Sequence, residues 1–190
     1  MLLHLILVRL RDVGRWFRPA GFVLAGLFLL MPFIAVSCET PGGFGRAAPG
    51  GTTSYSGIDL MTGSSPEVSP ADKVREGADE RLDPQPLAMA GGLLIVAGMV
   101  ITVVLQHQLL RRAIATTVAG AAAIFLLANQ ITVQSLLRAR VREQITQPLP
   151  ANKQIADYVQ NESGFWLCLV TLIVLVMANG VGWLRSATRA

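Results

Sequence analysis

The sequence is poor in the residues that build catalytic and metal-binding sites. Its two cysteines cannot form a disulfide framework or a zinc site on their own. Its two histidines, His4 and His107, stand about 100 residues apart. No HExxH, P-loop or serine nucleophile-elbow motif occurs in the chain. We therefore predict a protein without catalytic residues, cofactor or metal site.

Charged residues are scarce as well. They make up 15% of the 190 residues, whereas soluble globular domains contain about a quarter. The charges gather in short stretches, and long apolar runs separate these stretches. A bilayer core roughly 30 Å thick is crossed by about 20 apolar helical residues. The composition therefore predicts one membrane domain and leaves no room for a separate soluble domain with its own core.

Four apolar runs have the length of a membrane span and contain no Asp, Glu, Lys or Arg. They predict transmembrane helices over residues 20–37, 86–106, 113–133 and 164–184. A proline in the first run, Pro32, is tolerated in a membrane helix and suggests a kink. The expected fold class is an all-α integral membrane protein with four transmembrane helices. Because ionisable residues within spans usually mark ion pathways, their absence argues against an ion-coupled transporter.

The distribution of basic residues sets the expected orientation. Residues 1–19 mix apolar side chains with arginines and predict an amphipathic helix lying on the inner membrane surface. With this segment inside, the turn 107–112 and the tail 185–190 are inside as well. The basic residues of these three inner segments are Arg9, Arg11, Arg15, Arg18, Arg111, Arg112, Arg185 and Arg189. They oppose a single acid, Asp12, so both termini are expected in the cytoplasm.

The net charge of +4 is explained in the same way. Because the arginines flank the apolar runs, they indicate topology and contact with membrane lipids rather than nucleic-acid binding. The usage of alanine, arginine and glycine suggests a high-GC bacterium, and hence the bacterial cytoplasmic membrane.

The first outer segment, residues 38–85, is predicted to be an irregular loop. Glycine, proline, serine and threonine dominate its first part, and these residues favour turns. Within it, Thr52–Leu60 has strand-like composition and could form a short β-hairpin. The segment is either a solvated connector or a docking surface for a partner.

The second outer segment, residues 134–163, is predicted to be a helical arm. Hydrophobic residues recur at four-residue spacing at Val133, Leu137 and Val141. This period predicts that the third membrane helix continues to about Gln147, with the nearby arginines facing elsewhere. A short helix over residues 151–161 is expected to lead back to the membrane.

The cysteines offer two alternatives besides two unpaired apolar residues. The stretch Ile34–Cys38 (IAVSC) ends an apolar run that follows a basic segment. It resembles the lipobox of bacterial lipoproteins, with Ala35 where leucine is usual, and this resemblance implies cleavage before Cys38 and lipidation of its thiol. Alternatively, Cys38 and Cys168 are expected at similar depth on the outer side, where a disulfide could join them.

Small residues recur along the predicted spans. They are Gly91 and Gly98 in the second span, Ala115, Ala119 and Ala123 in the third, and Ala178 and Gly182 in the fourth. Such residues let membrane helices approach closely, so we predict that they form helix-packing faces.

These observations favour a non-enzymatic accessory, assembly or anchoring subunit of a larger membrane complex, with other membrane protein subunits as partners. The alternative is a small transporter or channel whose pore forms on oligomerisation. Such a pore needs a polar stripe along one helix face, but the few polar residues of the spans gather near their ends.

Overall fold

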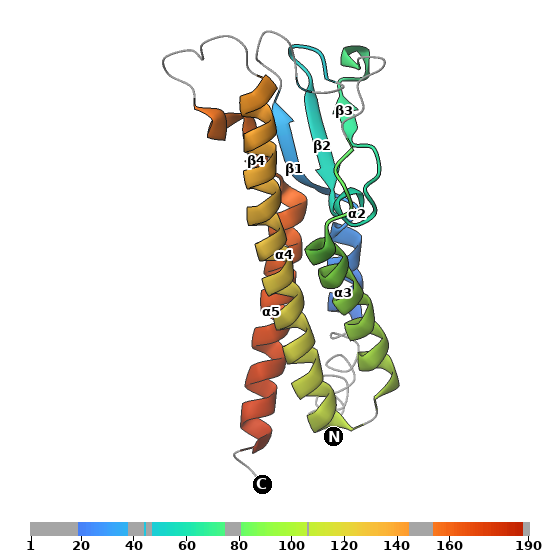
Figure 1. The fold of residues 1–190 in the computed structure, drawn as a ribbon. Coiled ribbons are helices and arrows are strands. Elements are labelled where there is room, and N and C mark those ends of the chain that lie inside the picture. Colours follow the sequence, from blue (N-terminus) through green and yellow to red (C-terminus); the bar gives the residue numbers. More distant parts are fainter. Residues whose placement is uncertain are drawn as a thin grey trace, which may run out of the picture.

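The computed structural model describes residues 19–37, 44, 47–74, 81–105, 107–144 and 154–187. This part of the chain is mostly helical, and a small sheet caps one end of the helices (Figure 1). We name this end the sheet end, and the opposite end, near Leu105 and His107, the turn end. An apolar helix covers Pro19–Phe28. The elements that follow are β1 (Pro32–Ser37), β2 (Thr52–Ser56), α2 (Gly57–Thr62), β3 (Glu67–Ser69), η1 (Ala71–Lys73), α3 (Pro86–Val104), α4 (Gln108–Gln144), η2 (Ile155–Tyr158), β4 (Val159–Asn161) and α5 (Ser163–Ala187).

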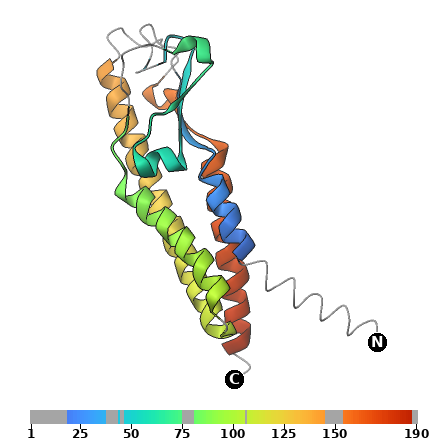
Figure 2. The same cartoon turned by 90° about the vertical axis from the view of Figure 1, so that its right-hand side faces the viewer.

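Three helices, α3, α4 and α5, are long and apolar enough to cross a membrane. The central one, α4, packs against both α3 and α5, while the helix Pro19–Phe28 lies beside α5 (Figure 2). Large apolar side chains on the outward sides are exposed, including Leu93, Ile124 and Met177. Because a lipid core accommodates such side chains, this belt suggests a membrane location.

The prediction that residues 20–37 form one transmembrane helix is wrong. The helix ends at Phe28, and residues from Pro32 onward form strand β1. Proline cannot donate a backbone hydrogen bond and disfavours the interior of a helix, whereas the following Phe33–Val36 favours a strand. All four residues Phe33–Val36 are buried, so they form a continuous apolar run that periodicity cannot distinguish from a buried helix. The predicted count of four spans is therefore not confirmed.

The all-α prediction holds only in part. The structure is mostly helical, but the sheet end carries a four-stranded antiparallel sheet in the order β3-β2-β1-β4. Strand β2 lies in the stretch expected to form a hairpin, but it pairs with β1, placing Val36 opposite Thr53 and Ser37 opposite Thr52. Helix α2 follows directly and is started by a capping box between Ser56 and Asp59. The expected irregular loop is thus largely ordered where the structure describes it.

Helix α4 links the helix bundle to the sheet. Its 37 residues extend about 55 Å at 1.5 Å per residue, well beyond the thickness of a lipid core. The expected continuation of the helix beyond residue 133 is observed as far as Gln144, the last described residue of this helix. Residues with the predicted spacing, Val133, Leu137 and Val141, are at most 4% exposed. They belong to the same hydrophobic core as the buried residues of β1, so α4 supports the sheet.

Three further expected boundaries differ from the structure. The 107–112 turn is shorter, because α4 already begins at Gln108. The helix expected over 151–161 is replaced, in its described part, by η2 and β4. The tail expected from 185 begins later, because α5 continues to Ala187. The amphipathic helix predicted for 1–19 lies outside the described residues except for Pro19.

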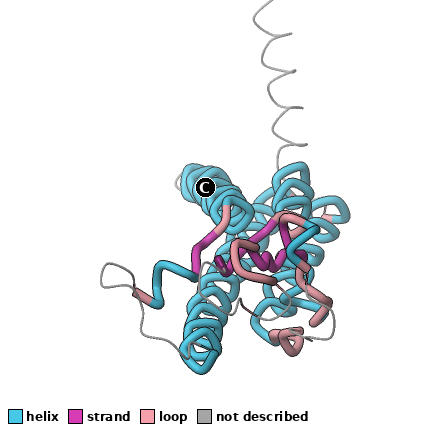
Figure 3. Tube along the Cα trace, turned by 90° about the horizontal axis from the view of Figure 1, so that it is seen from above, coloured by secondary structure: helices cyan, strands magenta, loops and turns pink. Residues whose placement is uncertain are grey.

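Two glycines allow other elements to pack against residues 29–32, the crossing that connects the first helix to β1. A Cβ atom on Gly57 would lie 2.9 Å from the carbonyl oxygen of Leu29, and one on Gly164 would lie 2.5 Å from that of Pro32. Both contacts are closer than a real Cβ atom allows, so α2 and α5 can approach this backbone only through glycine. The rings of Phe33 and Phe165 then meet edge to face, with centroids 5.8 Å apart. Seen along the long axis, the strands lie within the outline of the helix bundle (Figure 3), and the outer part of α4 runs beside them (Figure 1).

Candidate functional site

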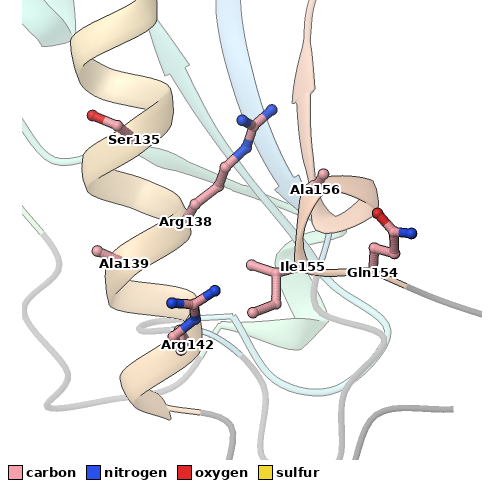
Figure 4. Close-up of a pocket in the computed structure, with 7 residues that line it drawn as sticks. All are labelled: Ser135, Arg138, Ala139, Arg142, Gln154, Ile155 and Ala156. Carbon is pink, nitrogen blue, oxygen red and sulfur yellow. The ribbon is translucent and has the colours of Figure 1, made fainter.

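An open pocket lies between α4 and η2 near the sheet end (Figure 4). Its volume is about 650 Å³. It is lined by Ser135, Arg138, Ala139 and Arg142 of α4, and by Gln154, Ile155 and Ala156 on the η2 side. The two arginines stand one helical turn apart, so their charged groups can act on the same ligand.

The buried stripe of α4, formed by Val133, Leu137 and Val141, determines the side of the helix on which these arginines lie. Arg138 and Arg142 each follow a residue of that stripe, Leu137 and Val141 respectively. One residue turns the helix by about 100°, so burial of the stripe against the sheet brings both arginines to the neighbouring side. Both are exposed, and that side faces η2 in Figure 4.

A cluster of amide side chains fixes the η2 wall relative to α4. Gln130 Nε2 donates a hydrogen bond to Asn161 Oδ1 at 2.6 Å and lies 3.4 Å from the carbonyl oxygen of Phe33. Gln134 Nε2 donates to the same Asn161 oxygen. Since Asn161 ends β4, which continues directly from η2, these bonds tie the wall to the long helix. Asp157 steadies η2 itself, because its carboxylate accepts a 2.7 Å hydrogen bond from the Gln154 N–H.

The small residues singled out in the sequence lie at several helix contacts. On α4, Ala115, Ala119 and Ala123 are buried. A Cβ atom on Gly91 would lie 3.0 Å from Leu126 of α4, and one on Gly98 would lie 2.4 Å from the Phe22 ring. The two small residues predicted to pack in the fourth span, Ala178 and Gly182, have different surroundings. Ala178 is exposed, while the carbonyl oxygen of Gly182 accepts a 2.6 Å hydrogen bond from Arg112 Nη1.

That bond joins α4 to α5 near the turn end. The neighbouring Arg111 is 7% exposed, so both arginines predicted for the inner turn belong to α4 and pack into the helix bundle. Arg9, Arg11, Arg15, Arg18 and Arg189 lie outside the described residues. Arg185 is part of α5, and its side chain is not described.

Cys168 is a free, buried thiol. Its Sγ lies 3.5 Å from the carbonyl oxygen of Ala25 and donates to it, which lends no support to the alternative of a disulfide with Cys38. Cys38 itself lies outside the described residues, but it follows Ser37 directly. Because β1 runs for six residues, about 20 Å at strand spacing, the chain travels away from the first helix before it reaches Cys38.

The strand also bears on the lipobox resemblance. Cleavage before Cys38 would remove β1, which lies between β2 and β4. The sheet would lose its central strand and the buried side chains of Phe33, Ile34 and Val36. Residues 32–37 therefore have a structural role in the sheet, and cleavage before Cys38 would remove it.

Together these features define a helix bundle of membrane-spanning length and composition, with a small sheet at one end and an arginine-lined pocket. Within the described ranges, no three His, Cys, Asp or Glu side chains gather closely enough to hold a metal ion. Comparisons with known protein families, with curated proteins and with solved structures found no match. The sequence indicated the direction of Arg138 and Arg142 through the neighbouring hydrophobic stripe. It did not indicate the opposite wall, since residues 151–161 were expected to be helical.

Proposed function

We propose that this chain is a non-enzymatic accessory or assembly subunit of a larger membrane complex. The observation that carries the proposal is the sheet end, where four separate chain segments assemble a small domain on the rigid extension of α4. This domain presents an open pocket with charged groups on one wall. Such a construction suits the binding of another molecule outside the membrane.

The outward sides of the helices support this function over an oligomeric pore. The exposed residues there are mostly large and apolar, as at Val100, Ile131 and Val174. The hydroxyls of Thr117 and Thr171 donate to carbonyl oxygens of their own helices, and the amide of Asn179 does the same. A pore between copies needs a polar stripe on such faces, whereas these faces suit lipid or the helices of other subunits.

The proposed location is the bacterial cytoplasmic membrane, with the turn end in the cytoplasm and the sheet end outside. Arg111 and Arg112 lie beside the α3–α4 turn, and Arg185 is near the C-terminal end of α5. Cytoplasmic flanks of membrane helices are enriched in such residues. The sheet end carries all the described acids, namely Asp59, Glu67, Asp72, Asp83, Glu143, Asp157 and Glu162.

Purification of the tagged full-length chain from its native membrane in a gentle detergent tests the proposed function. We expect other membrane proteins to co-purify in fixed ratio, as measured by mass spectrometry against an unrelated tagged multi-pass protein. Recovery of the chain alone, as a homo-oligomer, would contradict the subunit role and favour the transporter or channel alternative. The intact mass from the same sample should show that residues 19–37 are retained.

A further inference from the structure

Uncompensated positive charge distinguishes the pocket between α4 and η2. Within the described part of the chain, neither Arg138 nor Arg142 has a hydrogen-bond or salt-bridge partner. Like charges spaced four residues apart on a helix repel one another. A bound anion would remove this repulsion, and guanidinium groups pair especially well with carboxylates and phosphates, often through two parallel hydrogen bonds.

Among the described residues, few acids lie near these two arginines. The nearest in sequence is Glu143, which follows Arg142 on α4, is exposed and does not line the pocket. The segment that joins the two pocket walls, residues 145–153, contains no Asp or Glu. Asp157 is already bonded to the Gln154 N–H. Glu67 and Asp72 belong to the β3 side, which is the opposite edge of the sheet from β4, about 14 Å away at normal strand spacing. The pocket is therefore suited to a negative group that another molecule supplies.

The position of the pocket along α4, relative to the exposed apolar residues, favours a protein ligand over a lipid headgroup. Ile131, 67% exposed, is the last large apolar residue of α4 with more than half of its surface exposed before the sheet end, and only Leu136, 37% exposed, follows it. Arg138 and Arg142 lie about 10 and 16 Å beyond Ile131 along the helix. The headgroup layer on each side of a bilayer is only about 5–7 Å thick. A membrane boundary at Ile131 would place both arginines beyond this layer, and a boundary at Leu136 would still place Arg142 about 9 Å further along the helix.

We propose that the Arg138–Arg142 pocket binds an acidic segment of a partner protein, through Asp or Glu carboxylates paired with the two guanidinium groups. Ala139, Ile155 and Ala156 supply apolar surface for the methylene groups of such side chains. The amide of Gln154 stands on the opposite wall and adds a donor. This inference rests on the proposed subunit function and identifies the surface by which the partner docks.

The test uses the full-length chain in nanodiscs of zwitterionic lipid, with a fluorescein-labelled hexaglutamate peptide as the probe. Fluorescence anisotropy should detect binding that weakens at least about tenfold in Arg138→Gln and in Arg142→Gln. The matched control is Arg140→Gln, which removes the same charge from the same helix but does not line the pocket. It should change the affinity less than about twofold.

Equal weakening by all three substitutions would reveal non-specific attraction to the helix and overturn the proposal, as would the absence of peptide binding. Two further experiments test whether the anion that binds in the pocket is inorganic phosphate or a lipid headgroup. Displacement of the peptide by millimolar inorganic phosphate but not by acetate would assign the pocket to phosphate. Loss of peptide binding in nanodiscs that contain phosphatidylglycerol would assign it to lipid headgroups.

Repeating the native purification with the Arg138→Gln/Arg142→Gln chain separates the two proposals. Loss of the co-purifying partner supports both of them. A partner retained by this variant shows that the chain is a subunit whose docking surface lies elsewhere. The absence of a partner from the unaltered chain instead overturns the proposed function itself.

Discussion

Replacement of Gly164 by alanine is expected to destabilise the folded chain by about 1–3 kcal/mol, the usual cost of overpacking. The new methyl group would lie 2.5 Å from the Pro32 carbonyl oxygen and 2.7 Å from the Met31 Cβ atom. These atoms belong to the crossing between the first helix and β1, which cannot move aside without displacing the strand. Thermal unfolding in detergent, followed by the loss of the monodisperse peak in size-exclusion chromatography, measures the effect.

Gly180→Ala provides the control for this substitution. It lies in the same helix, and its added methyl group would come no closer than 3.9 Å to Thr116. Alanine is also the better helix former, so the control should unfold at an unchanged or slightly higher temperature. If both variants unfold at the same temperature, α5 does not approach the crossing as the structure describes.

Leu137→Asp is expected to detach the sheet from α4, whereas Leu136→Asp is expected to leave it in place. The two leucines are neighbours on the helix, but Leu137 is fully buried and Leu136 is 37% exposed. Burial of an unpaired carboxylate is so unfavourable that the site opens to water or the group takes up a proton, while a charge at an exposed position costs little.

Hydrogen exchange with mass spectrometry measures this difference. Amides of β1 and β2 should exchange slowly in the unaltered chain and in Leu136→Asp, because they are paired within the sheet. They should exchange quickly in Leu137→Asp. Similar protection in both variants would show that the sheet is held without α4.

The sequence predicted the helices well where length and composition alone decide the structure. The expected spans 86–106, 113–133 and 164–184 fall within, or within two residues of, α3, α4 and α5. The continuation of α4 was also predictable, because its buried stripe repeats at helical spacing beyond the uncharged run. In these segments local pattern and tertiary packing agree.

The sequence failed where tertiary contacts override an ambiguous local pattern. Residues 33–36 are as apolar as a membrane span, and only pairing with distant strands makes them β1. The short strands β3 and β4 have three residues each, too few for an alternating pattern to be recognised. The pocket was missed for the same reason, because its η2 wall is positioned by a hydrogen bond between Gln130 and Asn161, 31 residues apart.

The pairing of β1 with β2 is the feature on which the sheet, the α4 contact and the pocket wall depend, and cysteine cross-linking tests it most directly. Ser37 and Thr52 are partners in the register, and antiparallel partners have Cα separations of about 4.5–5.5 Å, suitable for a disulfide. The experiment introduces Ser37→Cys and Thr52→Cys into a chain that carries Cys38→Ser and Cys168→Ser. The control pair is Ser37→Cys with Ser56→Cys, because Ser56 lies about 13 Å further along β2.

Arg46 lies between the two cysteines, so trypsin separates them unless a disulfide holds the two peptides together. After oxidation, mass spectrometry of the non-reduced digest should detect the linked peptides for the Ser37/Thr52 pair and not for the Ser37/Ser56 pair. That result would establish β1 as a strand in the described register. Linkage of neither pair, or of both equally, would contradict the register and return residues 20–37 to the status of a membrane span.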